Sequence, residues 1–177
     1  MYQSVAVQSQ NLIFTETPYQ MKIAKKMGIA LLVVLIGMQF FRPEKNLADT
    51  DFVAAFEAET KPSPEIQKIL ETSCYDCHSA NTKYPWYSNI APISYWMNGH
   101  IEDGKKHLDF SDWPNLTAKK KDHKLEEFIE YVENGEMPLK EYTWTHEDAR
   151  LSDEQKKALL NWAEKARSLY QVAQIPN

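Results

Sequence analysis

The chain has 177 residues, of which 43% are hydrophobic and 25% charged, with five glycines and nine prolines. This composition is typical of a globular protein and excludes a collagen-like, disordered or coiled-coil chain. The net charge of −5 argues against a nucleic-acid partner, because nucleic-acid-binding proteins normally carry a basic face. Two cysteines are too few for a disulfide-rich scaffold, and a mean hydropathy of −0.55 excludes several membrane spans.

The N-terminal region differs in charge from the remainder of the chain. Residues 1–43 contain four basic residues and one acidic residue, whereas residues 44–177 contain 16 lysines and arginines against 24 aspartates and glutamates, a balance of −8. Residues 1–20 are polar and show no pattern, so we interpret them as a leader that either belongs to the protein or precedes a natural start at Met21. The sequence leaves both starts, Met1 and Met21, open.

An uncharged apolar run occupies residues 28–41 and follows Lys22, Lys25 and Lys26. A basic flank before an apolar stretch is typical of an export signal or a signal anchor. Because no small-residue cleavage site follows the run, we expect an uncleaved signal anchor, a transmembrane helix over residues 21–42. The lysines predict that its N-terminal side faces the cytoplasm and that residues 44–177 lie outside it. A buried core helix is the alternative for so short a run.

Proline residues frame the segment that follows. Residues 43–62 are predicted to form a spacer with a short helix over residues 51–59, and a folded domain is expected over residues 63–177. Ser63 before Pro64 is a typical helix start, which predicts a helix over residues 64–72 that runs directly into Cys74.

Apolar residues at helical spacing continue through the rest of the domain. Helices are predicted from Pro92 to about Leu108, from Thr117 to Asn134, and after Ser152, which forms a capping-box pattern with Gln155. No segment alternates with the period of a strand. The sequence therefore predicts an all-α domain of four or five helices behind the N-terminal transmembrane helix.

Both cysteines of the chain fall in one motif, Cys74-Tyr75-Asp76-Cys77-His78. The spacing C-x-x-C-H is the signature of covalent c-type haem attachment. Residues three apart on a helical turn share a face, so both sulfurs can reach the two vinyl groups of one porphyrin. His78 then follows in position to bind the iron as the proximal ligand. We predict one covalently attached haem c held by these three residues.

Three other interpretations of the cysteines stay open. A redox-active dithiol would need a βαβ context, which the sequence does not predict. A zinc site needs four ligands, and His100 and His107 are seven residues apart, which is not the usual finger spacing. A plain disulfide is compatible with the two cysteines but gives His78 no role.

The predicted sixth iron ligand is Met137, because Pro138 favours an extended loop from which a thioether can reach an open haem face. Ligation by histidine and methionine suits electron transfer. His100 is the alternative distal ligand, and Met137 would then only fill a core gap. An open sixth position would instead indicate a haem-based sensor or a small peroxidase.

Aromatic residues gather after the motif. We predict that Tyr84, Trp86, Tyr87 and Trp96 surround the haem, with ordinary packing as core and rim aromatics as the alternative.

From Arg42 to Lys165 the chain resembles the bacterial haem-binding-domain family, whose members are single C-x-x-C-H, cytochrome c-like proteins. The residues that carry the resemblance are Arg42-Pro43, Ser73 to Ser79, Asn81-Thr82, Tyr84 to Tyr87, Ile90 to Pro92, His100-Ile101, Gly104-Lys105, Phe110 to Trp113, Gly135 to Leu139, and Leu151-Ser152 with Trp162. The resemblance implies covalent haem on Cys74 and Cys77, a proximal His78, an N-terminal membrane anchor and a periplasmic domain.

These features together predict a monohaem electron carrier, rather than an enzyme, at the periplasmic face of the bacterial inner membrane. The alternative is the sensor or small peroxidase with an open or displaceable sixth ligand. The acidity of residues 44–177 favours a redox partner whose docking surface is basic.

Overall fold

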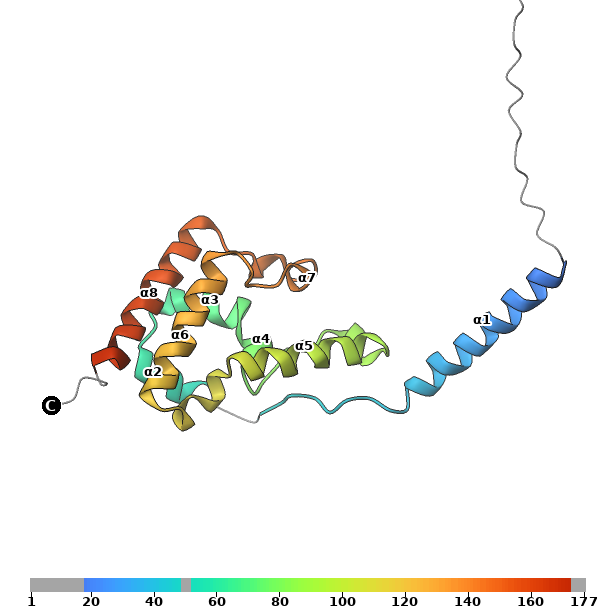
Figure 1. Cartoon of the computed structure of the whole chain (residues 1–177), viewed down its shortest axis with the longest axis horizontal. Coiled ribbons are helices and arrows are strands. Elements are labelled where there is room, and N and C mark those ends of the chain that lie inside the picture. The colour runs from blue at the N-terminus through green and yellow to red at the C-terminus, as the bar shows by residue number, and fades with distance from the viewer. Residues whose placement is uncertain (1–17, 49–51, 173–177) are drawn as a thin grey trace, which may run out of the picture. The chain divides into compact units, whose positions relative to one another are not determined.

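The computed structural model describes residues 18–48 and 52–172. In these two ranges the chain is helical, and its only strand-like pairing is an isolated antiparallel bridge between Leu47 and Asn81 (Figure 1). The predicted all-α fold is confirmed. The chain divides into two compact units with the boundary between Phe41 and Arg42.

Helix α1, Pro18–Met38, forms where the apolar run was predicted to be helical. Among the described residues, however, no helix combines the length and the apolar character that a membrane crossing requires. The prediction of a transmembrane anchor over residues 21–42 is therefore corrected. Three lysines lie in the first half of α1, and the uncharged helical residues 27–38 rise by only about 18 Å. Residues 1–17 of the expected polar leader lie outside the described residues.

The described residues of the second unit form four α-helices of ten or more residues and three short ones. Their bounds are α2 Ala54–Thr60, α3 Pro64–Ser73, α4 Tyr75–His78, α5 Ile93–His107, α6 Ala118–Glu133, α7 Lys140–Thr143 and α8 Asp153–Val172, with 3-10 helices η1 Trp86–Asn89, η2 Phe110–Asn115 and η3 Glu147–Ala149. The four longer helices are the ones that the apolar spacing predicts. Helix α2 lies where a short helix over residues 51–59 is predicted. The other short helices have six residues or fewer, too few to show a period.

The predicted helix starts are formed by side-chain caps. The hydroxyl of Ser63 accepts a hydrogen bond from the backbone N–H of Ile66 at 3.3 Å, at the start of α3. Before α8, the N–H of Ser152 donates to Oε1 of Gln155 at 2.9 Å, and the N–H of Gln155 donates to Oγ of Ser152 at 3.2 Å. This reciprocal pair is the predicted capping box, and it fixes where α8 begins.

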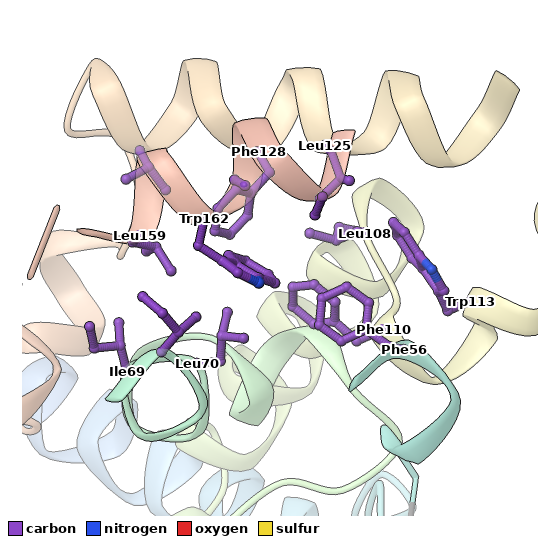
Figure 2. Packing of buried hydrophobic residues seen from close by; sticks show 14 of the residues in the cluster. Phe56, Ile69, Leu70, Leu108, Phe110, Trp113, Leu125, Phe128, Leu159 and Trp162 are labelled. Atoms are coloured by element: carbon purple, nitrogen blue, oxygen red, sulfur yellow. The ribbon is translucent and has the colours of Figure 1, made fainter. Parts of the chain in front are cut away.

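Helices α6 and α8 pack side by side, and an aromatic cluster fills the core between them and α2, α3 and η2 (Figures 1 and 2). Phe56 of α2 is fully buried, with its ring 4.5 Å from that of Phe110 and 4.9 Å from that of Trp113. The segment 43–62, expected to be a spacer, thus supplies a central core residue. The compact unit begins at Arg42 instead of at residue 63.

Replacing Phe56 with alanine tests this central role. Phe56→Ala should lower the free energy of unfolding by about 3–5 kcal/mol, because it opens a cavity among three aromatic rings. Urea unfolding of the full chain measures the change. The control Leu169→Ala on α8 removes a side chain that is 52% exposed and should cost under about 0.5 kcal/mol. A loss for Phe56→Ala no larger than the control's would contradict this account.

Helix α5 approaches the turn of α4 so closely that only glycine fits at the contact. A Cβ added at Gly104 would lie 2.7 Å from the carbonyl oxygen of Cys77 and 3.2 Å from its Cβ. Because the closer atom belongs to the backbone, a side chain at this position could be accommodated only by moving one helix away from the other. Gly99, on the same helix, has no atom within 4 Å of such a Cβ.

Replacing each of the two glycines of α5 with alanine should therefore change the stability of the protein in opposite directions. Gly104→Ala should destabilise the protein by about 1–3 kcal/mol through overpacking against Cys77. Gly99→Ala should instead stabilise it by up to about 1 kcal/mol, because alanine is the better helix former. Thermal unfolding of both variants makes the comparison, and shifts of the same sign and size would refute a close contact at Gly104.

Candidate functional site

The C-x-x-C-H motif forms one helical turn between α3 and α5. Cys74 caps the end of α3, and its carbonyl oxygen accepts hydrogen bonds from the N–H groups of Cys77 at 3.2 Å and His78 at 3.0 Å. Both cysteines are free and partly buried. The turn therefore presents two thiols and one imidazole from five consecutive residues, as the spacing predicts.

The imidazole of His78 is oriented by the chain that follows α5. Its Nδ1 lies 2.9 Å from the carbonyl oxygen of Leu108, which can only accept, so Nδ1 carries the proton and Nε2 keeps its lone pair. Burial lowers the pKa of His78, although the carbonyls of Leu108 and Gly104 act in the opposite direction. A neutral imidazole with a fixed ring and a free Nε2 is the form that binds a metal.

The pKa values of the two thiols are shifted in the direction opposite to that of a reactive dithiol. Burial raises the pKa of Cys74 to about 12 and that of Cys77 to about 11, so both sulfurs stay protonated. Redox-active cysteines normally have a lowered pKa. Within residues 18–48 and 52–172 there is also no group of three or more histidine, cysteine or acidic side chains that could hold a metal ion. Neither the dithiol nor the zinc interpretation gains support from this geometry.

The two residues between the cysteines anchor the turn to the rest of the domain. The hydroxyl of Tyr75 donates to Oε1 of Glu57 in α2 at 2.8 Å. The carboxylate of Asp76 accepts from the backbone N–H of Lys83 at 3.0 Å and from the hydroxyl of Tyr142 at 2.8 Å. Sequence reasoning missed these roles because the motif leaves both intervening positions unspecified.

The thiols and His78 line a cavity of about 580 Å³. Its wall continues over one face of α5, the inner face of α6 and the chain after α6, and is mainly apolar. Its members include Cys74, Cys77, His78, Trp96, His100, Gly104, His107, Leu108, Phe110, Phe128, Tyr131, Val132, Met137, Leu139, Tyr142 and Leu159. A volume of this size is in the range of cofactor sites, which reach from about 300 to 1,000 Å³.

Met137 reaches this cavity because of the way α6 ends. Gly135 has a φ of +71°, a left-handed conformation that glycine adopts readily and that is common just after the end of a helix. The N–H groups of Glu136 and Met137 both donate to the carbonyl of Tyr131, at 2.9 and 3.1 Å. Met137 is partly buried, packs against the core cluster and lines the cavity. It is thus placed both for core packing and for contact with a bound group.

His100 lines the same cavity from α5. Its Nδ1 lies 2.8 Å from the carbonyl oxygen of Trp96, and its ring lies 4.4 Å from the Trp96 ring. Trp96 itself lines the cavity while remaining 52% exposed, which places it at the rim. The structure therefore brings both candidate distal ligands to the cavity that holds His78.

Three of the four aromatic residues expected around the haem lie elsewhere. Tyr84, Trp86 and Tyr87 are not part of the cavity wall. The Tyr84 hydroxyl accepts from the N–H of Asn46 at 2.9 Å, and Trp86 is 77% exposed with its ring edge against Tyr87. They follow the motif in sequence, Tyr84 before η1 and Trp86 and Tyr87 within it, but lie outside the cavity wall. Beside Trp96, the aromatic residues of the wall are Tyr95, Phe110, Phe128, Tyr131 and Tyr142, and no local signal connects the last four to the motif.

The residues at this cavity suit a haem: two protonated thiols, a directed neutral imidazole and a thioether share one largely apolar space. A comparison with protein families matches residues 33–165 to the haem-binding domain family. Searches of curated proteins and of solved structures found no match. With a match over most of its length and this arrangement of side chains, the chain belongs to the haem-binding domain family and is a haem-binding protein.

Proposed function

We propose that this protein is a monohaem c-type electron carrier that works outside the cytoplasm. One observation carries the proposal: Cys74, Cys77 and an imidazole fixed by the Leu108 carbonyl line the same cavity as Met137. Haem bound there would supply one-electron chemistry at its iron. The chain itself would attach the porphyrin, direct the ligands and exclude water.

Covalent attachment accounts for both cysteines where the alternatives do not. The sulfurs lie on one turn, stay protonated and have no neighbouring set of metal-binding side chains in the described part of the chain. Thioether formation needs two thiols at this spacing beside a histidine, which is the arrangement of residues 74–78.

The contacts of α5 favour Met137 over His100 as the distal ligand. Helix α5 packs directly on Cys77 at Gly104, and the residue after it, Leu108, holds His78. His100 lies one turn before Gly104, on the same helix that supports the proximal histidine. Met137 comes from an independent segment after α6. A distal ligand must approach the iron from the side away from His78, so a separate segment is better suited to provide it.

Location and partner follow from the charge pattern. The lysines before the apolar residues of α1 fit an export signal that brings the domain to the periplasm and to the surface of the inner membrane, where haem is attached to C-x-x-C-H motifs. The charge of −8 over residues 44–177 suits a redox partner with a basic docking surface.

The attachment is tested on full-length protein from a host that exports it and attaches haem. The intact mass should equal the chain plus one haem, and the pyridine haemochrome spectrum should be that of haem c. Cys74→Ala and Cys77→Ala should each leave a single thioether and a shifted haemochrome band, and the double variant should release its haem on denaturation. Ser73→Ala, at the same cavity wall, should keep both thioethers. Matured protein with only the mass of the bare chain would overturn the proposal.

The ligand assignment is tested by carbon monoxide binding to the reduced haem protein. The wild type should resist carbon monoxide, whereas Met137→Ala should bind it rapidly and should have a lower reduction potential, because the thioether raises it. His100→Ala should behave like the wild type. If His100→Ala binds carbon monoxide rapidly and Met137→Ala does not, the distal ligand is His100. Rapid binding by the wild type would favour the sensor or peroxidase instead.

A further inference from the structure

Tyr142 connects the segment that carries Met137 to the turn that carries the cysteines. Its hydroxyl lies 2.8 Å from Oδ2 of Asp76 and 3.3 Å from the carbonyl oxygen of Thr72. In the sequence, Asp76 stands between the two cysteines. Asp76 and Tyr142 are 66 positions apart in the sequence. Tyr142 belongs to α7, which begins two residues after Pro138, and it lines the cavity together with Met137.

The acceptor side of this bond is firmly held. Asp76 is only 7% exposed, and the backbone N–H of Lys83 donates to its other oxygen at 3.0 Å. The Thr82 hydroxyl also donates to the Asp76 carbonyl at 2.6 Å. No lysine or arginine forms an ion pair with Asp76 in the described ranges, so the Tyr142 hydroxyl is a major partner of this carboxylate. Hydrogen bonds to a buried charge are stronger than those between neutral groups.

Helix α7, which carries the hydrogen-bond donor Tyr142, is too short to hold this side chain in place by itself. Helix α7 has four residues, a single turn, and the His146 ring stacks on the Tyr142 ring at 4.2 Å with an angle of 12°. Burial and the neighbouring Asp76 raise the pKa of Tyr142, which keeps its hydroxyl a donor. The segment from Met137 to Tyr142 is therefore tied at its start to the Tyr131 carbonyl and at its end to Asp76.

We propose that Tyr142 is a positioning residue, whose hydrogen bond to Asp76 holds the Met137 segment against the haem-attachment turn. This inference rests on the proposed function, in which Met137 is the distal ligand. It assigns a role to the aspartate between the cysteines: Asp76 links the proximal turn to the segment that carries the distal ligand.

The test compares Tyr142, in the cavity wall, with a tyrosine outside it in the full-length haem protein. Tyr142→Phe removes the bond to Asp76. Tyr87→Phe is the matched control, because Tyr87 lies outside the cavity wall and its hydroxyl has no hydrogen-bond partner in the part of the chain that the structure describes. Tyr142→Phe should speed carbon monoxide binding to the reduced protein on the order of tenfold and lower the reduction potential, as expected for losing a bond to a buried charge. Rates equal for both variants would overturn the proposal.

A role in stability alone would give a different result. It would lower the melting temperature of Tyr142→Phe without changing the potential or the carbon monoxide rate, and that outcome also overturns the proposal. Asp76→Asn approaches the same bond from the acceptor side and provides the second variant if Tyr142→Phe does not accumulate. It should speed carbon monoxide binding as well, and the double variant should exceed the larger single effect only slightly.

The Met137→Ala background separates this inference from the proposed function. In that background Tyr142→Phe should have no further effect on carbon monoxide binding, because the ligand that it positions is gone. If Met137→Ala opens the site and Tyr142→Phe matches Tyr87→Phe, the positioning role fails and the proposed function stands. If Met137→Ala itself changes nothing, the distal ligand is misassigned and the inference fails with it.

Discussion

The site depends on the hydrogen bond between Nδ1 of His78 and the carbonyl oxygen of Leu108. A histidine that can rotate binds a metal weakly, and a fixed acceptor both selects the tautomer and sets the ring direction. The Leu108 carbonyl is fixed because Leu108 is itself buried, its N–H donates to the Gly104 carbonyl at 2.9 Å, and η2 follows with core residues. The packing of α5 on α4 at Gly104 therefore determines where the imidazole points.

The five residues of the motif have two kinds of role: three provide the chemical groups, and two hold the turn in place. The cysteines and His78 present two thiols and an imidazole to the cavity, whereas the side chains of Tyr75 and Asp76 form hydrogen bonds to α2 and α7. A turn this short could not keep its direction through its own hydrogen bonds, because a single helical turn is marginally stable. Its rigidity comes from partners that lie 18 and 66 positions away in the sequence.

This division explains how much the sequence could predict. The four longer helices follow from local caps and apolar spacing, and the C-x-x-C-H turn follows from the spacing of three residues. The core position of Phe56 and the bonds of Asp76 depend on long-range packing, which no local pattern reports. Tyr84, Trp86 and Tyr87 are predicted near the haem because they follow the motif, but closeness in sequence does not fix where the chain after α4 runs. Helix α1 includes the lysines that precede the apolar run, so the length of the apolar run alone does not set the extent of the helix.

The cavity and the core are not separate structures. Leu108, Phe110, Phe128, Val132 and Leu159 belong to the core cluster and also line the cavity. A group that fills this space covers apolar surface of the core itself, and burial of such surface stabilises the folded state. Ligand binding to the native state alone adds to the free energy of unfolding. A haem bound in this cavity would thus be part of the folded interior, and the residues that line the cavity would act on stability and on ligation together.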